Sequence, residues 1–210
     1  MRTVFLDAGG VLFNNVGAES GFVAAIAERY QADQHVLGAE LFAAAHRYET
    51  GAENVHDVIA DVLGALDRSA HVDTARLDRM YLRSVRVHEP VLRAVRAIQR
   101  WEVAVVLANN EAEHWDRLKD TRFGHLGLVD EVCSSWKVGH VKPSAEFFAA
   151  VMSACPGATS TMLFVDDRPS VLAVAADLGM RTLHAADPAE LPARLACALG
   201  GGASSNGEYE

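Results

Sequence analysis

The chain has 210 residues, half of them hydrophobic, which is enough for a sizeable core in one or two domains. It carries 19 Lys and Arg against 28 Asp and Glu, a formal net charge of −9. This balance argues against a general nucleic-acid or anionic-membrane surface, which needs a basic patch, but leaves open a small phosphorylated ligand, whose recognition is local.

The chain begins with an apolar, β-prone run from Thr3 to Leu6 that ends in Asp7, with Gly9 and Gly10 close behind. Such a run without polar alternation is typical of a strand covered on both faces. Asp7 then lies at the carboxyl end of the strand, where open α/β sheets bind ligands, and the glycines allow a sharp turn and a close approach. An ordinary turn after an edge strand has the same residues, so this stretch alone decides nothing.

Apolar residues keep helical spacing through most of residues 14–87, with predicted breaks near Gly38, Thr50-Gly51 and Arg68-Ser69. A block of this length is too long for a simple crossover helix, so we predict an inserted helical subdomain. The polar segment from His46 to Gly51 fits either a loop that touches a substrate or a solvated helix end, and we favour the helix end.

From residue 88 to residue 199, helical and strand patterns alternate, which predicts a doubly wound parallel α/β sheet. The predicted strands after the first are 103–108, 129–134, 161–165 and 181–184, and the predicted helices follow Pro90 or span 112–119, 144–155, 169–178 and 189–199. Residues 200–210 are small and polar, which predicts a disordered tail. The resulting division is a core of 1–13 and 88–199, a helical cap of 14–87 and the tail.

The sequence shows neither a membrane-spanning segment nor a cysteine pattern typical of disulfides. No apolar run is long enough for a membrane span, and Asp7 interrupts the one near the N-terminus, so we predict no signal peptide, no membrane helix and a cytoplasmic location. The cysteines are odd in number and far apart, which predicts buried, unpaired thiols in a reducing compartment. They are Cys133, Cys155 and Cys197.

Three later stretches carry polar residues that we expect to lie near the end of the first strand. Asn109-Asn110 follow the second strand, Asp166-Asp167 end another, and Lys142-Pro143 opens a helical segment with Pro at a predicted first helical position. Asp7, Asp166 and Asp167 would meet at one sheet edge, where repelling carboxylates are usually held by a hard cation such as Mg²⁺. Capping of the helix at 169–178 is the competing interpretation of Asp166-Asp167.

The order of these motifs resembles the haloacid dehalogenase-like hydrolase superfamily, in the helical-cap subgroup near sugar-1-phosphate phosphatases and the phosphatase half of soluble epoxide hydrolases. The resemblance runs from Asp7 to about Gly179. It implies that Asp7 is a nucleophile forming an aspartyl phosphate and that Lys142 neutralises the phosphoryl charge. It also implies that Mg²⁺ is held by Asp7, the Gly9 carbonyl, Asp166 and Asp167. The substrate-binding residues implied are Gly9, Gly10, Ala108, Asn109 and Asn110.

Two positions depart from the usual phosphatase pattern. Gly9 stands where a second Asp commonly serves as general acid and base, an effect of about 10²–10⁴-fold. Ala108 stands where a hydroxyl residue commonly binds a phosphoryl oxygen. Proton donors that could replace the missing Asp are Glu49, Glu113 and His114, each of which also fits a surface residue.

The function predicted is therefore a Mg²⁺-dependent phosphatase of a small phosphorylated metabolite, which Gly9 and Ala108 could make slow. We expect it to act as a monomer or homodimer with no nucleic-acid or membrane partner. A dehalogenase that uses Asp7 on carbon would need no leaving-group proton, which Gly9 fits, but would not need the Asp166-Asp167 pair. A catalytically degenerate binding protein is the third possibility.

Overall fold

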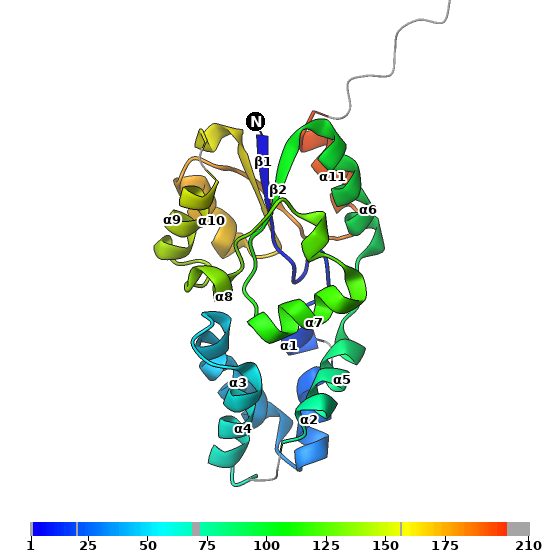
Figure 1. Ribbon diagram of the computed structural model, residues 1–210, viewed down its shortest axis with the longest axis vertical. Coiled ribbons are helices and arrows are strands. Elements are labelled where there is room, and N and C mark those ends of the chain that lie inside the picture. Colours follow the sequence, from blue (N-terminus) through cyan, green and yellow to red (C-terminus); the bar gives the residue numbers. More distant parts are fainter. Residues whose placement is uncertain (1, 20, 69–71, 156, 201–210) are drawn as a thin grey trace, which may run out of the picture.

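A computed structural model describes residues 2–19, 21–68, 72–155 and 157–200 (Figure 1). One sheet has the strand order β3-β2-β1-β4-β5, and every pairing is parallel. This confirms the predicted α/β class, because neighbours in the sheet are joined by crossover helices. The predicted tail lies outside the described residues apart from Gly200. The strands are β1 Arg2–Leu6, β2 Val103–Leu107, β3 Glu131–Val132, β4 Met162–Asp166 and β5 Arg181–His184.

Two hydrophobic clusters cover the two faces of the sheet. Side chains alternate between faces along a strand, so Val4 and Leu6 belong to one cluster and Phe5 to the other. Figure 1 shows α6 and α11 on one side of the sheet and α9 and α10 on the other. The core helices are α6 Glu89–Ile98, α7 Glu113–Phe123, α8 Ser135–Val138, α9 Ala145–Ala154, α10 Pro169–Asp177 and α11 Leu191–Ala198.

Residues 14–87, called here the helical insertion, connect β1 to α6 and lie below the sheet in Figure 1. The predicted break at Gly38 is wrong, since Gly38 lies inside α3. The helix instead begins after Asp33, whose Oδ1 accepts from His35 N at 2.9 Å and from Val36 N at 3.0 Å. One interior glycine costs only about 1 kcal/mol, which packing outweighs. The helices are α1 Val16–Glu19, α2 Phe22–Tyr30, α3 Gln34–Glu49, α4 Val55–Ala65 and α5 Thr74–Ser84.

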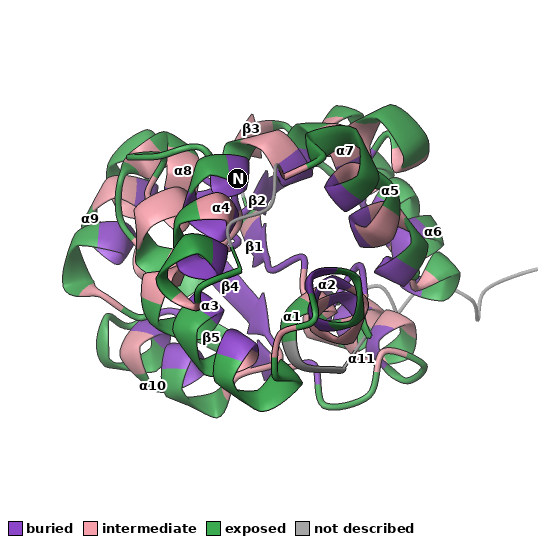
Figure 2. Ribbon diagram, turned by 90° about the horizontal axis from the view of Figure 1, so that it is seen from below, coloured by how far each residue is buried: buried purple, intermediate pink, exposed green. Residues whose placement is uncertain are grey.

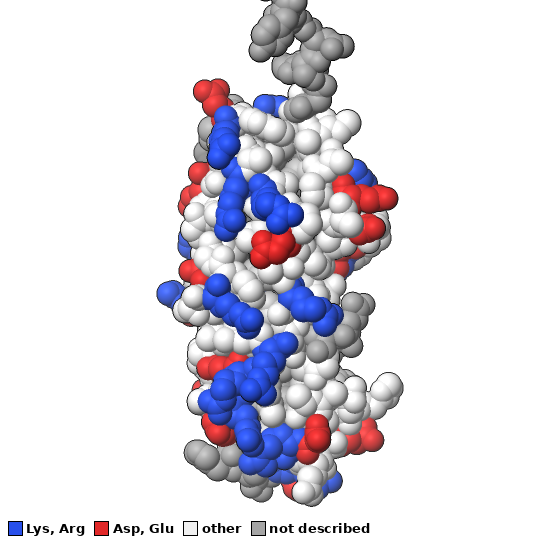
Figure 3. Space-filling model, turned by 90° about the vertical axis from the view of Figure 1, so that its right-hand side faces the viewer, with Lys and Arg blue, Asp and Glu red and all other residues white. Residues whose placement is uncertain are grey.

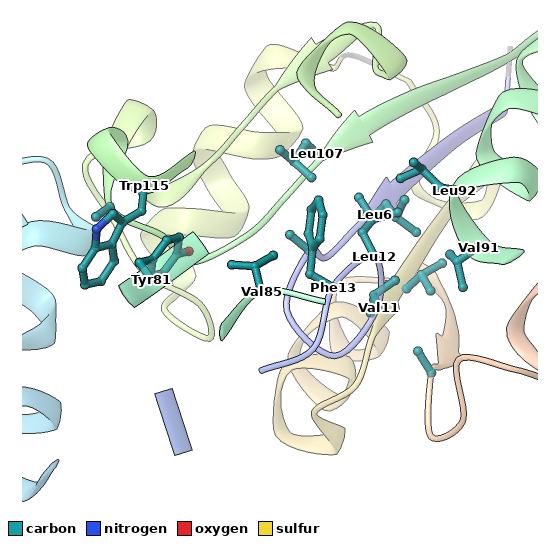
Figure 4. Packing of buried hydrophobic residues seen from close by; sticks show 14 of the residues in the cluster. Leu6, Val11, Leu12, Phe13, Tyr81, Val85, Val91, Leu92, Leu107 and Trp115 are labelled. Atoms are coloured by element: carbon teal, nitrogen blue, oxygen red, sulfur yellow. The ribbon is translucent and has the colours of Figure 1, made fainter. Parts of the chain in front are cut away.

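The chain leaves the core for the helical insertion near Phe13 and returns near Val87, and these two segments lie side by side. Phe13 and Val87 form an antiparallel bridge, Asn14 N donates to Arg86 O at 3.0 Å, and His88 N donates to Leu12 O at 2.8 Å. Figure 4 shows the buried side chains continuing through this junction, from Leu6 and Leu107 on the sheet to Tyr81 and Trp115. Seen from below, α5 and α6 turn buried residues inward and exposed residues outward (Figure 2).

The segment around Pro143 differs from the predicted helix start. Ser144 is the N-cap of α9, with its Oγ accepting from Phe147 N at 3.2 Å, so the helix begins at Ala145 and not at the proline. The Lys142–Pro143 peptide bond is cis. The predicted strand 129–134 is also shorter, because Ser135 already begins α8 and only Glu131–Val132 pair with β2.

Charge is distributed unevenly over the surface. Figure 3 shows basic side chains gathered along the face that α5 and α6 form, despite the overall charge of −9. Net charge therefore does not describe this face, and the expectation of no nucleic-acid partner stays a prediction. The exposed arginines of this region are Arg76, Arg79, Arg83, Arg86, Arg93, Arg96 and Arg100.

The structure also bears on the expected lack of membrane helices and on the cysteines. Among the described residues, no helix combines the length and apolar character needed to cross a membrane. All three cysteines are free; Cys133 is buried as expected, whereas Cys197 is exposed.

Candidate active site

The carboxyl ends of β1 and β4 bring Asp7 and Asp166 to the same lysine. Nζ of Lys142 lies 2.9 Å from Oδ1 of Asp7 and donates to Oδ2 of Asp166 at 2.7 Å. All three side chains are buried. The parallel register of β1 and β4, which pairs Leu6 with Val165, fixes this meeting, because the two carboxylates leave adjacent strands at the same edge.

The two carboxylates differ in acidity. Burial raises the pKa of Asp7 to about 6, although Lys142 opposes the rise, and the nearby charge of Asp166 adds to it. Burial also acts on Asp166, but its contacts with Lys142 and with the backbone N–H of Arg168 hold its pKa below the ordinary value. The lysine thus stabilises a negative charge at the strand ends that would otherwise be costly to bury.

Asp167 completes a three-carboxylate group with Asp7 and Asp166, in which one oxygen of each lies within 4.8 Å of the others. Oδ2 of Asp167 accepts from Nδ2 of Asn15 at 2.9 Å. The turn after β1 permits this approach, since Gly10 has φ +68° and any β-carbon there would lie 2.2 Å from Oδ2 of Asp167.

The residues that end the second strand have different surroundings. Ala108 is buried in the apolar cluster that contains Phe5. Asn110 holds the Lys142 loop, with its Oδ1 accepting from Lys142 N at 2.8 Å and its Nδ2 donating to Lys142 O at 3.1 Å. The side chain of Asn109 is buried, lines the cavity described next, and has no hydrogen-bond partner among the described residues.

A cavity of about 1240 Å³ lies between this sheet edge and the helical insertion. Asp7, Gly9 and Lys142 line its core side, and Tyr48 and Glu49 line its other side. Residues 46–51 are a helix end, as expected, since α3 ends at Glu49, but this end is only partly solvated: Tyr48 and Glu49 are half-buried and line the cavity. Burial raises the pKa of Glu49 to about 7, with a further rise from Glu111 that Arg168 and Lys142 oppose.

Four aromatic rings form one wall of the cavity. Tyr81 and Trp115 stack with centroids 4.4 Å apart, and Phe22 and Tyr48 meet the edge or face of Trp115 at 5.2 and 5.9 Å. These rings come from distant parts of the chain, so only the fold unites them. Helical spacing marked Phe22 and Tyr81 as apolar positions but could not distinguish a cavity wall from an ordinary core.

The other two candidate proton donors lie elsewhere. Glu113 forms an exposed ion pair with Arg117 at 2.8 Å, and His114 contacts Asp78 of α5 at 2.9 Å. Neither belongs to the cavity lining.

This geometry agrees with a match at the level of sequence. The family model described as haloacid dehalogenase-like hydrolase covers residues 1–179. The chain belongs to the haloacid dehalogenase-like hydrolases. The nucleophile, lysine and acidic positions that the resemblance implied all fall inside the matched region.

Solved structures of other haloacid dehalogenase-like proteins share this fold. A family enzyme from Bacteroides thetaiotaomicron has a TM-score of 0.73 and 20% identity over 88% of this chain and 93% of its own. The same enzyme, at 19% identity, was solved in complex with magnesium and inorganic phosphate. L-2-haloacid dehalogenase from Xanthobacter autotrophicus, with chloropropionic acid covalently bound, has a TM-score of 0.61 and 17% identity over 88% of this chain and 77% of its own.

At these identities the structural likeness concerns the fold. None of the curated proteins compared with this haloacid dehalogenase-like chain matches it.

Proposed function

We propose that this hydrolase is a Mg²⁺-dependent phosphatase of a small phosphorylated metabolite, with Asp7 as the nucleophile. The observation that carries the proposal is the group of Asp7, Lys142, Asp166 and Asp167 at the sheet edge that borders the cavity. A fixed cation next to a carboxylate nucleophile suits phosphoryl transfer, in which negative charge spreads over the transferring oxygens.

The donor set fits Mg²⁺. Carboxylate and carbonyl oxygens are the ligands that this hard cation prefers, and it is commonly bound by one or two carboxylates with waters and substrate phosphate. Asp7, Asp166, Asp167 and the carbonyl of Gly9 are the residues proposed to hold it. When bound, the ion supplies neutralisation of the phosphoryl charge.

The chain's own groups account for the two chemical steps. An oxygen of Asp7 forms a bond to phosphorus while the bond from phosphorus to the leaving-group oxygen breaks. Water then attacks phosphorus, releasing inorganic phosphate and regenerating the carboxylate of Asp7. The leaving-group oxygen needs a proton in the first step, and the attacking water must lose one in the second.

Glu49 is the proposed proton donor and acceptor in place of Gly9. It faces Asp7 across the cavity, and a pKa of about 7 keeps it near the balance between acid and base that this role requires. It gives its proton to the leaving-group oxygen and recovers one from the attacking water. Gly51, two residues further along, lies against the backbone of α8, which holds this end of α3 at the core.

The rest of the cavity supports a substrate class. The amide of Asn109, which has no hydrogen-bond partner in the described part of the chain, is suited to a phosphoryl oxygen, since a buried polar group costs free energy until it is paired. The aromatic wall suits a leaving group with an apolar or aromatic face. The helical insertion would then be a cap that selects the leaving group, while the sheet edge handles the phosphate.

The test compares wild type with Asp7→Asn, purified in parallel, on phosphate esters and 2-haloacids with and without Mg²⁺. The amide is nearly isosteric but cannot form an acyl phosphate, so only wild type should release phosphate, and only with Mg²⁺. Halide release without a metal requirement would favour a dehalogenase. Equal phosphate release by both proteins would show that the activity does not depend on Asp7, and would favour a binding protein over this enzyme.

A further inference from the structure

A second group of metal-ligating side chains lies outside the acidic site. His56 of α4, Asp78 of α5 and His114 of α7 place one ligand atom each within 4.8 Å of the others. Nε2 of His56 is 2.8 Å and Nε2 of His114 is 2.9 Å from the same atom, Oδ1 of Asp78. The two imidazole rings meet at a centroid distance of 4.4 Å.

We propose that His56, Asp78 and His114 form a binding site for a divalent transition-metal ion of the Zn²⁺ type. Two imidazole nitrogens and one carboxylate oxygen are a borderline-soft set, which favours Zn²⁺, Ni²⁺ or Co²⁺ and disfavours Mg²⁺. The site is thus chemically distinct from the all-oxygen group at Asp7, Asp166 and Asp167.

Two of the three separations between ligand atoms are already close to those that an ion requires, and all three atoms lie within 4.8 Å of one another. A Zn²⁺ ion bound at about 2.0–2.1 Å to each atom in a tetrahedral arrangement separates its ligand atoms by roughly 3.3 Å. The two N–O separations are now 2.8 and 2.9 Å, so Oδ1 of Asp78 must withdraw by about 0.5 Å. His56 is buried and His114 is about one-third exposed, which leaves an approach from solvent for the ion and for a water as fourth ligand.

At this position a bound ion would connect the helical insertion to the core. Two ligands belong to the helical insertion and the third to core helix α7, so an ion joins the two parts. Each ligand is also close in sequence to a cavity residue: Ile59, Tyr81 and Trp115 follow His56, Asp78 and His114 within one helical turn. A bound ion therefore holds together the helices that carry this side of the cavity.

The experiment measures Zn²⁺ and Co²⁺ binding to untagged full-length protein in saturating Mg²⁺, which occupies the acidic site first. We expect one Zn²⁺ per chain by calorimetry, a rise in melting temperature, and a visible Co²⁺ absorption band of a nitrogen- and oxygen-ligated site. Affinity should fall at least tenfold in His56→Gln and in His114→Gln, and the Co²⁺ band should disappear in both.

Two control variants match these changes. His140→Gln removes an exposed histidine outside the cluster, and Asp57→Asn removes an exposed carboxylate next to His56 on the same helix; both should bind as wild type does. His114→Gln is the decisive variant because its position, about one-third exposed, tolerates glutamine, as circular dichroism can verify. No stoichiometric Zn²⁺ binding by wild type, or equal binding by wild type and folded His114→Gln, would overturn the proposal.

Discussion

The side chain of Asn15 occupies the space that a side chain at Gly9 would enter: a β-carbon on Gly9 would lie 2.8 Å from Oδ1 of Asn15. Asn15 is held there by its hydrogen bond to Asp167 at 2.9 Å. An amide cannot transfer a proton to a leaving group, so Asn15 fills the place of the usual acid without taking its role.

The first prediction concerns a variant that restores this acid by placing Asp at position 9. In a Glu49→Gln background, where the proposed proton donor is absent, Gly9→Asp alone should gain little, because the new side chain meets Asn15. In the same background, Gly9→Asp with Asn15→Ala should raise turnover. The gain should be larger for alkyl phosphates than for activated aryl phosphates, because poor leaving groups depend most on the proton. Steady-state rates on both substrate types, with Asn15→Ala as control, measure this. Equal gains on the two types would show that the new carboxylate does not donate the proton to the leaving group.

The second prediction concerns Glu49→Gln. It should lower kcat for alkyl phosphates by about 10²–10⁴-fold and remove the decline in wild-type kcat expected as pH rises above about 7. Activated aryl phosphates should lose much less. A variant with an unchanged pH–rate profile would exclude Glu49 from proton transfer.

The same carboxyl predicts a third result, on stability. Glu49 ionises near pH 7 in the folded protein and near 4.5 in the unfolded chain, so the folded state binds more protons between these values. Wild-type stability should therefore include a loss as pH rises from about 4.5 to 7, and Glu49→Gln should lack that loss. Denaturant unfolding of both proteins across this pH range measures the difference. Parallel curves would show that Glu49 is not shielded from solvent.

The fourth prediction is that Gly51→Ala separates α3 from the core. Gly51 has φ +73°, and a β-carbon there would lie 2.5 Å from the carbonyl oxygen of Trp136, a backbone atom that cannot turn aside. We expect kcat/KM to fall about tenfold or more, because a displacement of about 1 Å moves Glu49 out of position. Gly64→Ala is the matched control, since its β-carbon meets nothing within 4 Å. Similar kinetics for the two variants would contradict this docking role.

The last prediction separates the acidic site from other carboxylates. Asp166→Asn should weaken Mg²⁺ binding at least tenfold, since a hard cation loses a charged oxygen ligand. Asp177→Asn, at an exposed position at the end of α10, should not change it. Calorimetric titration of both variants and wild type gives the comparison, and equal affinities would place the ion elsewhere.

The sequence predicted the parallel sheet and the strand-end carboxylates because both depend on short, local patterns. Asp7 and Asp166 each close an apolar strand, and parallel pairing then has to bring them together. The sequence named Glu49 only as one of three candidate proton donors and did not mark Asn15, because the positions of both depend on how the insertion folds back over the sheet. Gly38 shows the opposite error, in which a local signal for a break was outweighed by packing in α3.

The bridge between Phe13 and Val87 also bears on how the substrate preference of such a protein can change during evolution. Because the insertion leaves and re-enters the core at adjacent points, a different segment could be inserted there without disturbing the strand order or the sheet edge that carries Asp7 and Asp166. The incoming segment would have to cover Phe13 and Trp115, which are buried where the hydrophobic cluster continues into the present insertion. New substrate preferences can therefore arise by exchange of one module, provided that it brings its own apolar residues to the junction.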